Sequence, residues 1–108
     1  GAYHGDTIGS LAVGDGGFGT DVFDPLRFPV LRCPTLGAPG AVETATAMIA
    51  EHAHELAAVV LEPLVQGAAG MALIPPSAVA AVVIAAAIGL FPAIMTVTDE
   101  TTLPYGGR

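Results

Sequence analysis

The sequence predicts an α/β fold in which helices alternate with the strands of a parallel sheet. Two short runs, residues 56–61 (LAAVVL) and 94–98 (IMTVT), have the apolar character expected of strands that are buried on both faces. Each run follows a segment with the composition of a helix, residues 41–54 and the alanine-rich stretch after Ser77. The order helix, strand, helix, strand predicts βαβ units, whose strands are parallel.

The first residues are expected to form a short helix and a glycine-rich loop. Asp6 and Thr7 can cap a helix over residues 8–13, because a capping oxygen accepts hydrogen bonds from free amides of the first turn. A strand over the same residues is the alternative. Residues 14–19 spell G-x-G-x-x-G, but a dinucleotide site needs a strand before these letters and a helix after them. The Asp24-Pro25 pair interrupts any such helix, which favours a flexible loop.

The next segment is expected to be irregular, with one strand. Pro25 and Pro29 disfavour regular structure between them. Residues 30–33 are predicted to be a short strand that ends at Pro34, and a Gly/Pro connection follows over residues 36–40.

The predicted helix over residues 41–54 carries a cluster of ionisable residues at its end. Its apolar positions have helical spacing: Ala45, Met48, Ile49 and Ala53. His52 and His54 resemble metal ligands, but side chains two residues apart on a helix point in different directions. This geometry favours a solvated helix end over a zinc site.

The last part of the chain is predicted to contain a loop over residues 66–76, a helix that stops at Gly89, and the strand at 94–98. Residues 78–95 are all apolar, so a membrane span is an alternative. Gly89 and Pro92 interrupt the run, and no basic or aromatic anchors flank it, which favours a helix and a strand buried in a larger protein.

The charged residues and the single cysteine limit the partners, the chemistry and the cellular location that are expected for this chain. The net charge of −7 argues against a nucleic-acid partner, which would need a basic surface. All three basic side chains are arginines, so the chain alone cannot supply the lysine of a Schiff base. Cys33 is the only cysteine, which excludes an intrachain disulfide and fits a reducing compartment. The first residues lack the pattern of a signal peptide, so a cytoplasmic location is expected.

Two acids are predicted at the carboxyl ends of the strands, where ligands of α/β sheets bind. These are Glu62 and Asp99. Asp99 has two interpretations. It is either a loop or helix-cap acid, or a carboxylate that faces the cationic ring nitrogen of pyridoxal phosphate.

Three sequence blocks, in this order along the chain, resemble class III, fold-type I pyridoxal-phosphate aminotransferases. They are YHGDTIG at residues 3–9, HELAAVVLEPLVQGAAGM at residues 54–71, and Asp99-Glu100 followed by Tyr105-Gly106. Within this class the chain is most similar to the branch that acts in biotin biosynthesis. The likeness spans essentially the whole chain, and the first two blocks are the specific ones.

The resemblance implies that residues 1–108 are an internal part of the cofactor-binding large domain, with a partial parallel sheet of βαβ units. It implies that Tyr3 stacks on pyridoxal 5'-phosphate and borders the substrate, and that Asp99 binds the pyridine nitrogen. Glu62 and Gln66 line up with positions near the active site, without an assigned role. The cofactor lysine lies further along in the family, so the chain alone is expected to be inactive.

The implied reaction transfers an amino group from S-adenosylmethionine to 8-amino-7-oxononanoate, and the implied whole enzyme is a homodimer with small-molecule substrates and no membrane partner. The chain departs from the family pattern after residue 78, since the next helix has no charged face and Thr101–Pro104 intervene after the acid pair. A non-catalytic remnant or interaction module of the same fold therefore remains an alternative, as does a small membrane-associated protein.

Overall fold

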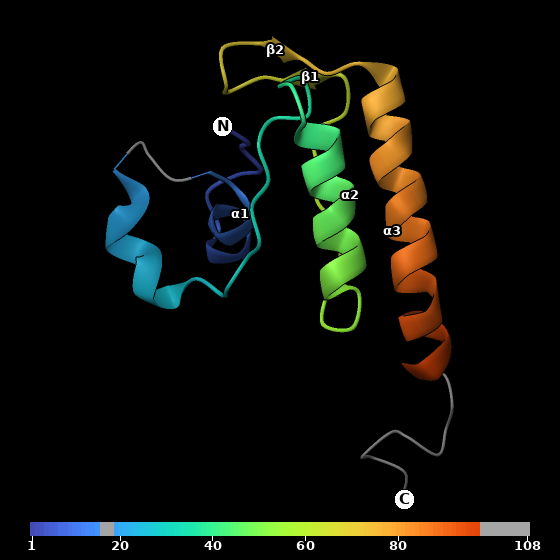
Figure 1. Ribbon diagram of the computed structural model, residues 1–108. Helices are drawn as coiled ribbons and strands as arrows, with labels where there is room; N and C mark the ends of the chain where they lie inside the picture. The colour runs from blue at the N-terminus through green and yellow to red at the C-terminus, as the bar shows by residue number, and fades with distance from the viewer. Residues whose placement is uncertain (16–18, 98–108) are drawn as a thin grey trace, which may run out of the picture.

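The structure is a computed structural model that describes residues 1–15 and 19–97 (Figure 1). Its elements are α1 (Ile8–Val13), the 3-10 helix η1 (Thr20–Leu26), α2 (Ala41–His52), β1 (Val65–Gln66), β2 (Ala72–Leu73) and α3 (Pro76–Val97). Helices α2 and α3 lie side by side, and the small sheet crosses one end of the pair (Figure 1). Helices α1 and η1 contact each other on the other side of α2.

The core lies between α2 and α3. Ala45 and Ile49 are buried on α2 at a spacing of one helical turn, as the predicted helix over residues 41–54 required. The helix is confirmed, and it ends two residues earlier, at His52. The buried cluster consists of Leu36, Ala45, Ile49, Ile74, Ala78 and Val82. Its members are small or medium-sized, so the two helices approach closely over a thin apolar layer.

The prediction that Gly89 ends the last helix is wrong. Helix α3 continues through Gly89 and Pro92 to Val97, so residues 94–97 of the expected strand are helical, and Thr98 lies outside the described residues. A Cβ atom at Gly89 would lie 3.2 Å from Ile49 Cγ2 and 3.6 Å from Ala53 Cβ. Gly89 is therefore a packing position, because the missing side chain leaves room for α2.

The described helices include none with the length and hydropathy of a bilayer span.

The expected parallel sheet is not found among the described residues. Residues 30–33 and 56–61 form no strand there, and the one sheet pairs β1 with β2 antiparallel, in the register Val65↔Leu73 and Gln66↔Ala72. This hairpin begins at Val65 and otherwise lies within the predicted loop over residues 66–76. A strand needs a neighbour to satisfy its amides and carbonyls, and no described segment pairs with residues 56–61. Val59 and Leu61 of that run still pack against the core.

The predicted helix at residues 8–13 is confirmed as α1, with Thr7 as its N-cap. The Thr7 hydroxyl accepts a hydrogen bond from the Ser10 amide at 3.4 Å. Gly14 follows as the C-cap, so a helix precedes the G-x-G-x-x-G letters and a 3-10 helix follows them. This context disagrees with a dinucleotide fingerprint, although Gly16, Gly17 and Phe18 themselves lie outside the described residues.

Candidate functional site

Glu62 joins the two segments that carry the specific sequence blocks. Its Oε1 atom accepts a hydrogen bond from the backbone amide of Tyr3 at 3.0 Å, although the two residues are 59 positions apart. Its Oε2 atom accepts one from the backbone amide of Gly67 at 2.9 Å. We call this pair of hydrogen bonds the Glu62 bridge. It brings the start of the chain against the loop that carries Glu62, β1 and Gly67.

The Tyr3 side chain is held at both ends and remains accessible between them. Its backbone belongs to the Glu62 bridge, and its hydroxyl donates to the Asp6 carboxylate at 3.0 Å. Gly5 between them has φ +112°, a conformation that L side chains rarely adopt and that lets Asp6 turn back towards the phenol. The residue is 50% exposed. An aromatic ring oriented in this way can stack on a planar ligand.

The first residues are also tied to the end of α1. The backbone amide of Asp15 donates to the carbonyl of Ala2 at 2.7 Å, and the amino group of Gly1 pairs with the Asp15 carboxylate. Gly14 is buried in this contact, where a Cβ atom would lie 3.3 Å from the Ala2 carbonyl oxygen. Tyr3 is thus placed by α1 on one side and by Glu62 on the other.

Gln66 attaches the same loop to a third segment. The residue is buried, and its Oε1 atom accepts a hydrogen bond from the Thr35 hydroxyl at 2.8 Å. Gln66 therefore fixes the position of β1, and Gly67 follows it directly in the chain. Sequence reasoning placed Glu62 and Gln66 near the site but gave them no role. The structure shows that both side chains bind other parts of the protein.

The electrostatics favour an ionised Glu62. The hydrogen bonds from the Gly67 and Tyr3 amides lower the pKa of this carboxyl group below its usual range. The charges of His4 and of the Gly1 amino group lower the pKa slightly further, and partial desolvation opposes them. At Tyr3, the hydrogen bond to Asp6 and the negative charge of Asp6 raise the pKa of the phenol. Near neutral pH the site thus contains a carboxylate and a neutral phenol.

The other expected cofactor residue, Asp99, lies outside the described residues, as do Glu100, Tyr105 and Gly106. The expectation that Tyr3 and Asp99 contact the same cofactor therefore stays a prediction.

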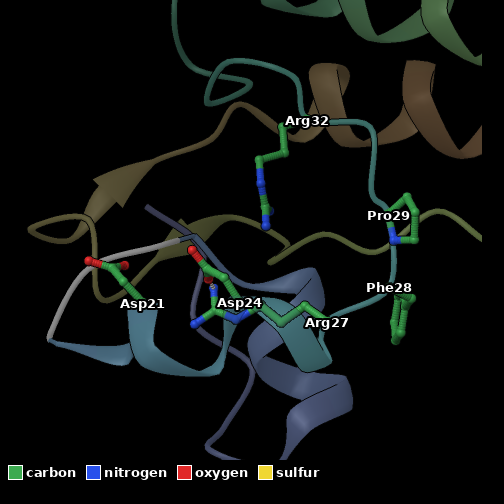
Figure 2. A pocket seen from close by; sticks show the side chains of 6 residues that line it. All are labelled: Asp21, Asp24, Arg27, Phe28, Pro29 and Arg32. Carbon is green, nitrogen blue, oxygen red and sulfur yellow. Dashed lines mark ion pairs between the residues drawn. The ribbon is translucent and has the colours of Figure 1, made fainter.

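An open pocket of about 400 Å³ is lined by none of the predicted site residues (Figure 2). It is lined by Asp21, Asp24, Arg27, Phe28, Pro29 and Arg32. Arg27 pairs with Asp24 at 3.3 Å and donates to the Thr20 carbonyl at 2.8 Å. Arg32 donates to the carbonyl of Ala12 at 3.0 Å. Both guanidinium groups thus bind the protein itself: Arg27 binds residues of η1, and Arg32 ties the segment after η1 to α1.

At the end of α2, His52 pairs with a glutamate. The Nδ1 atom of His52 lies 2.5 Å from a carboxylate oxygen of Glu55, one turn further on. Within residues 1–15 and 19–97, no group of three or more His, Cys, Asp or Glu side chains is placed to share a metal ion.

Comparison with known proteins finds relatives of this chain among the aminotransferases. A relative from Nitratidesulfovibrio vulgaris is 46% identical over 90 residues, which cover 68% of this chain and 16% of the relative. A relative from Geobacter sulfurreducens is 43% identical over 89 residues, with 68% and 19% covered, and one from Synechococcus elongatus is 40% identical over 85 residues, with 70% and 20% covered. The chain is therefore homologous to aminotransferases.

All three relatives carry the name adenosylmethionine-8-amino-7-oxononanoate aminotransferase, which confirms the resemblance expected from the sequence. The matched part of this chain corresponds to only 16–20% of the length of these relatives. No protein-family model matches the chain, and no solved structure matches it.

Proposed function

We propose that this chain supplies one side of the cofactor site of a pyridoxal-phosphate aminotransferase. The proposed reaction is the biotin-pathway transfer of an amino group from S-adenosylmethionine to 8-amino-7-oxononanoate. The observation that carries the proposal is the Glu62 bridge, because it joins the two blocks that resemble the family and leaves the Tyr3 ring accessible.

The residues at Tyr3 fit the planar ring of the cofactor. A half-exposed phenol ring, oriented through its amide and its hydroxyl, offers a flat surface for stacking. When bound, pyridoxal phosphate acts as an electron sink that stabilises a substrate carbanion. We assign to Tyr3 the stacking contact with the cofactor ring and a position beside the substrate. We assign to Asp99 the contact with the pyridine nitrogen.

Two carboxylates of the chain, those of Asp6 and Asp99, have different proposed roles. The Asp6 carboxylate accepts a hydrogen bond from the Tyr3 phenol and so orients the ring, whose phenol is already neutral near pH 7 and whose pKa Asp6 raises further. The Asp99 carboxylate would keep a proton on the pyridine nitrogen through its opposite charge. No lysine occurs in the sequence, so this chain alone is expected to catalyse no transamination. We further propose a cytoplasmic homodimer for the whole enzyme, on the strength of the resemblance.

The test uses pyridoxamine 5'-phosphate, which has no aldehyde and so cannot react with the amino group of Gly1. We expect this ligand to shift the NMR signals of the Tyr3 ring, and Tyr3→Ala to weaken its binding several-fold. Tyr105→Phe is the matched control, since the chain has two tyrosines. Unchanged Tyr3 signals at saturating ligand, or equal binding by Tyr3→Ala, would contradict the proposal.

A further inference from the structure

We propose that Glu62 is a positioning residue, whose ionised carboxylate places the Tyr3 ring by tying the Tyr3 backbone to the loop at Gly67. The role of the ring as a ligand contact rests on the function proposed above. The bridge itself does not, because it joins groups of this chain alone.

The bridge needs a carboxylate. Each Glu62 oxygen accepts one main-chain amide, at 3.0 Å from Tyr3 and 2.9 Å from Gly67. A protonated acid carries an O–H donor on one oxygen, and a glutamine replaces one oxygen with an NH₂ group. Either change places a donor group of residue 62 opposite the backbone N–H of Tyr3 or Gly67. At least one of the two hydrogen bonds is therefore lost. Both partners are backbone amides, so no other side chain can take over the donor's role.

The loop that contains Gly67 is held in place by other contacts within the protein. Gly67 follows Gln66, which is buried and bound to Thr35. In addition, the Ile74 amide beyond the hairpin donates to the Leu64 carbonyl at 2.8 Å. On the other side of the bridge, Tyr3 is half exposed, and its segment is otherwise tied to the end of α1 through Gly1 and Ala2. Glu62 therefore connects an anchored loop to an accessible segment.

The groups that face Glu62 favour its ionised form. His4 and the Gly1 amino group act on it from the first segment, and both are cationic when protonated. Among the described residues of the loop side, the Gly67 amide is its one hydrogen-bond donor, and the neighbouring Gln66 is neutral. The pKa of Glu62 is lowered as a result. The bridge is expected to be complete near neutral pH and to open when Glu62 is protonated, below the ordinary glutamate pKa of about 4.3.

The experiment follows backbone amide signals of the isotopically labelled chain by NMR as the pH is lowered from 7 to 2.5. We expect the amides of Tyr3 and Gly67 to titrate together, with one midpoint below the ordinary glutamate range. Glu62→Gln should abolish both titrations, whereas Glu51→Gln, an exposed acid on α2, should leave them unchanged. The amides of Ala45 and Val82 in the helix core report whether the chain stays folded.

Positioning requires that the ring responds too. In an Asp6→Asn background, which removes the other carboxylate bound to Tyr3, the ring protons of Tyr3 should follow the same midpoint. Separate midpoints for the two amides, no titration of either, or a Tyr3 ring that ignores the bridge would overturn the inference. If Glu62→Gln does not fold, the titration of the unsubstituted chain still decides. A failure of pyridoxamine phosphate to bind would contradict the proposed function and leave these amide signals as they are.

Discussion

The residues packed between α2 and α3 are aliphatic, whereas Tyr3 and its neighbours are held largely by hydrogen bonds and ion pairs to carboxylates. In the helix pair, Ile49 and Val82 are buried among other apolar side chains, and Gly89 permits the close approach. Around Tyr3, the contacts are hydrogen bonds and ion pairs to Glu62, Asp6 and Asp15. One region is stabilised by the burial of apolar surface and the other by charge-assisted hydrogen bonds.

This difference separates the helix pair, which is expected to determine the stability of the chain, from the segment around Tyr3, which is proposed to bind the cofactor. Apolar burial does not depend on protonation, so the helix pair is expected to keep its structure over a wide pH range. Hydrogen bonds to carboxylates weaken when the carboxylate is protonated. The segment around Tyr3, which is proposed to border the cofactor, is therefore expected to respond to pH more strongly than the core of the helix pair.

The largest expected effect lies in the helix pair. Ile49→Ala removes a side chain that is 5% exposed, and we expect it to reduce the free energy of unfolding by about 2–4 kcal/mol, because it leaves a cavity in a thin core. Ile88→Ala is the matched control, since Ile88 is 72% exposed on α3, and its effect should stay within about 0.5 kcal/mol. Urea unfolding followed by circular dichroism measures both. Equal losses for the two variants would disprove the assigned core.

A second substitution tests the close approach at Gly89. Gly89→Leu should destabilise the protein by about 1–3 kcal/mol, because its Cβ alone would lie 3.2 Å from Ile49 Cγ2. Gly9→Ala on α1 provides the contrast, since nothing lies within 4 Å of a Cβ atom there. The alanine should stabilise that helix by about 0.5–1 kcal/mol. If Gly89→Leu were as stable as the unsubstituted chain, α2 and α3 would not meet at this residue.

The next prediction concerns the loss of the Glu62 bridge at low pH. The pKa of Glu62 is lower in the folded chain than in the unfolded one, so its contribution to stability is present above the unfolded pKa and is lost as the pH falls through the folded value. Between pH 5 and pH 3, amide hydrogen exchange should therefore become faster at Tyr3 and Gly67, relative to the intrinsic rate at each pH, while Ala45 and Val82 keep their protection. Uniform loss of protection across both regions would remove the distinction between them.

The smallest expected effect is at the Tyr3 phenol. Asp6 raises the pKa of this group, so Asp6→Asn should lower it towards the ordinary value of about 10. The folded pKa is the higher one, so this interaction stabilises the chain below the unfolded pKa and is lost as the pH rises through the folded value. Ultraviolet absorbance of phenolate against pH measures the change, and a Tyr105→Phe background leaves only Tyr3 to titrate. An unchanged midpoint would show that Asp6 does not bind the phenol.

Local rules predicted the local structure well. The capping chemistry of Thr7 and the helical spacing of Ala45 and Ile49 depend on residues close in sequence, and both helices are confirmed. The expected strands at residues 30–33, 56–61 and 94–98 were wrong in the described range, because a strand depends on a partner that its own letters do not specify. Gly89 was misassigned for a related reason, since only the path of α2 shows that its missing side chain is needed for packing.

The site was predictable in part. Tyr3, Glu62 and Gln66 were identified from their blocks, but the hydrogen bond between Tyr3 and Glu62 spans 59 positions and leaves no signal in spacing or periodicity. The place of Glu62 directly after an apolar run predicted a carboxylate at a strand end, and in the structure this carboxylate binds two exposed backbone amides. The identity of the amides that it accepts depends on the fold.

The most direct test is the rate of amide hydrogen exchange at Tyr3 and Gly67 at neutral pH, compared between the unsubstituted chain and Glu62→Ala. If Glu62 joins the two segments, both amides exchange slowly in the unsubstituted chain and fast in the variant, with Ala45 and Val82 equally protected in both proteins. If Tyr3 and Gly67 exchange at the unprotected rate in the unsubstituted chain, or keep their protection in the variant, the Glu62 bridge does not hold the site together.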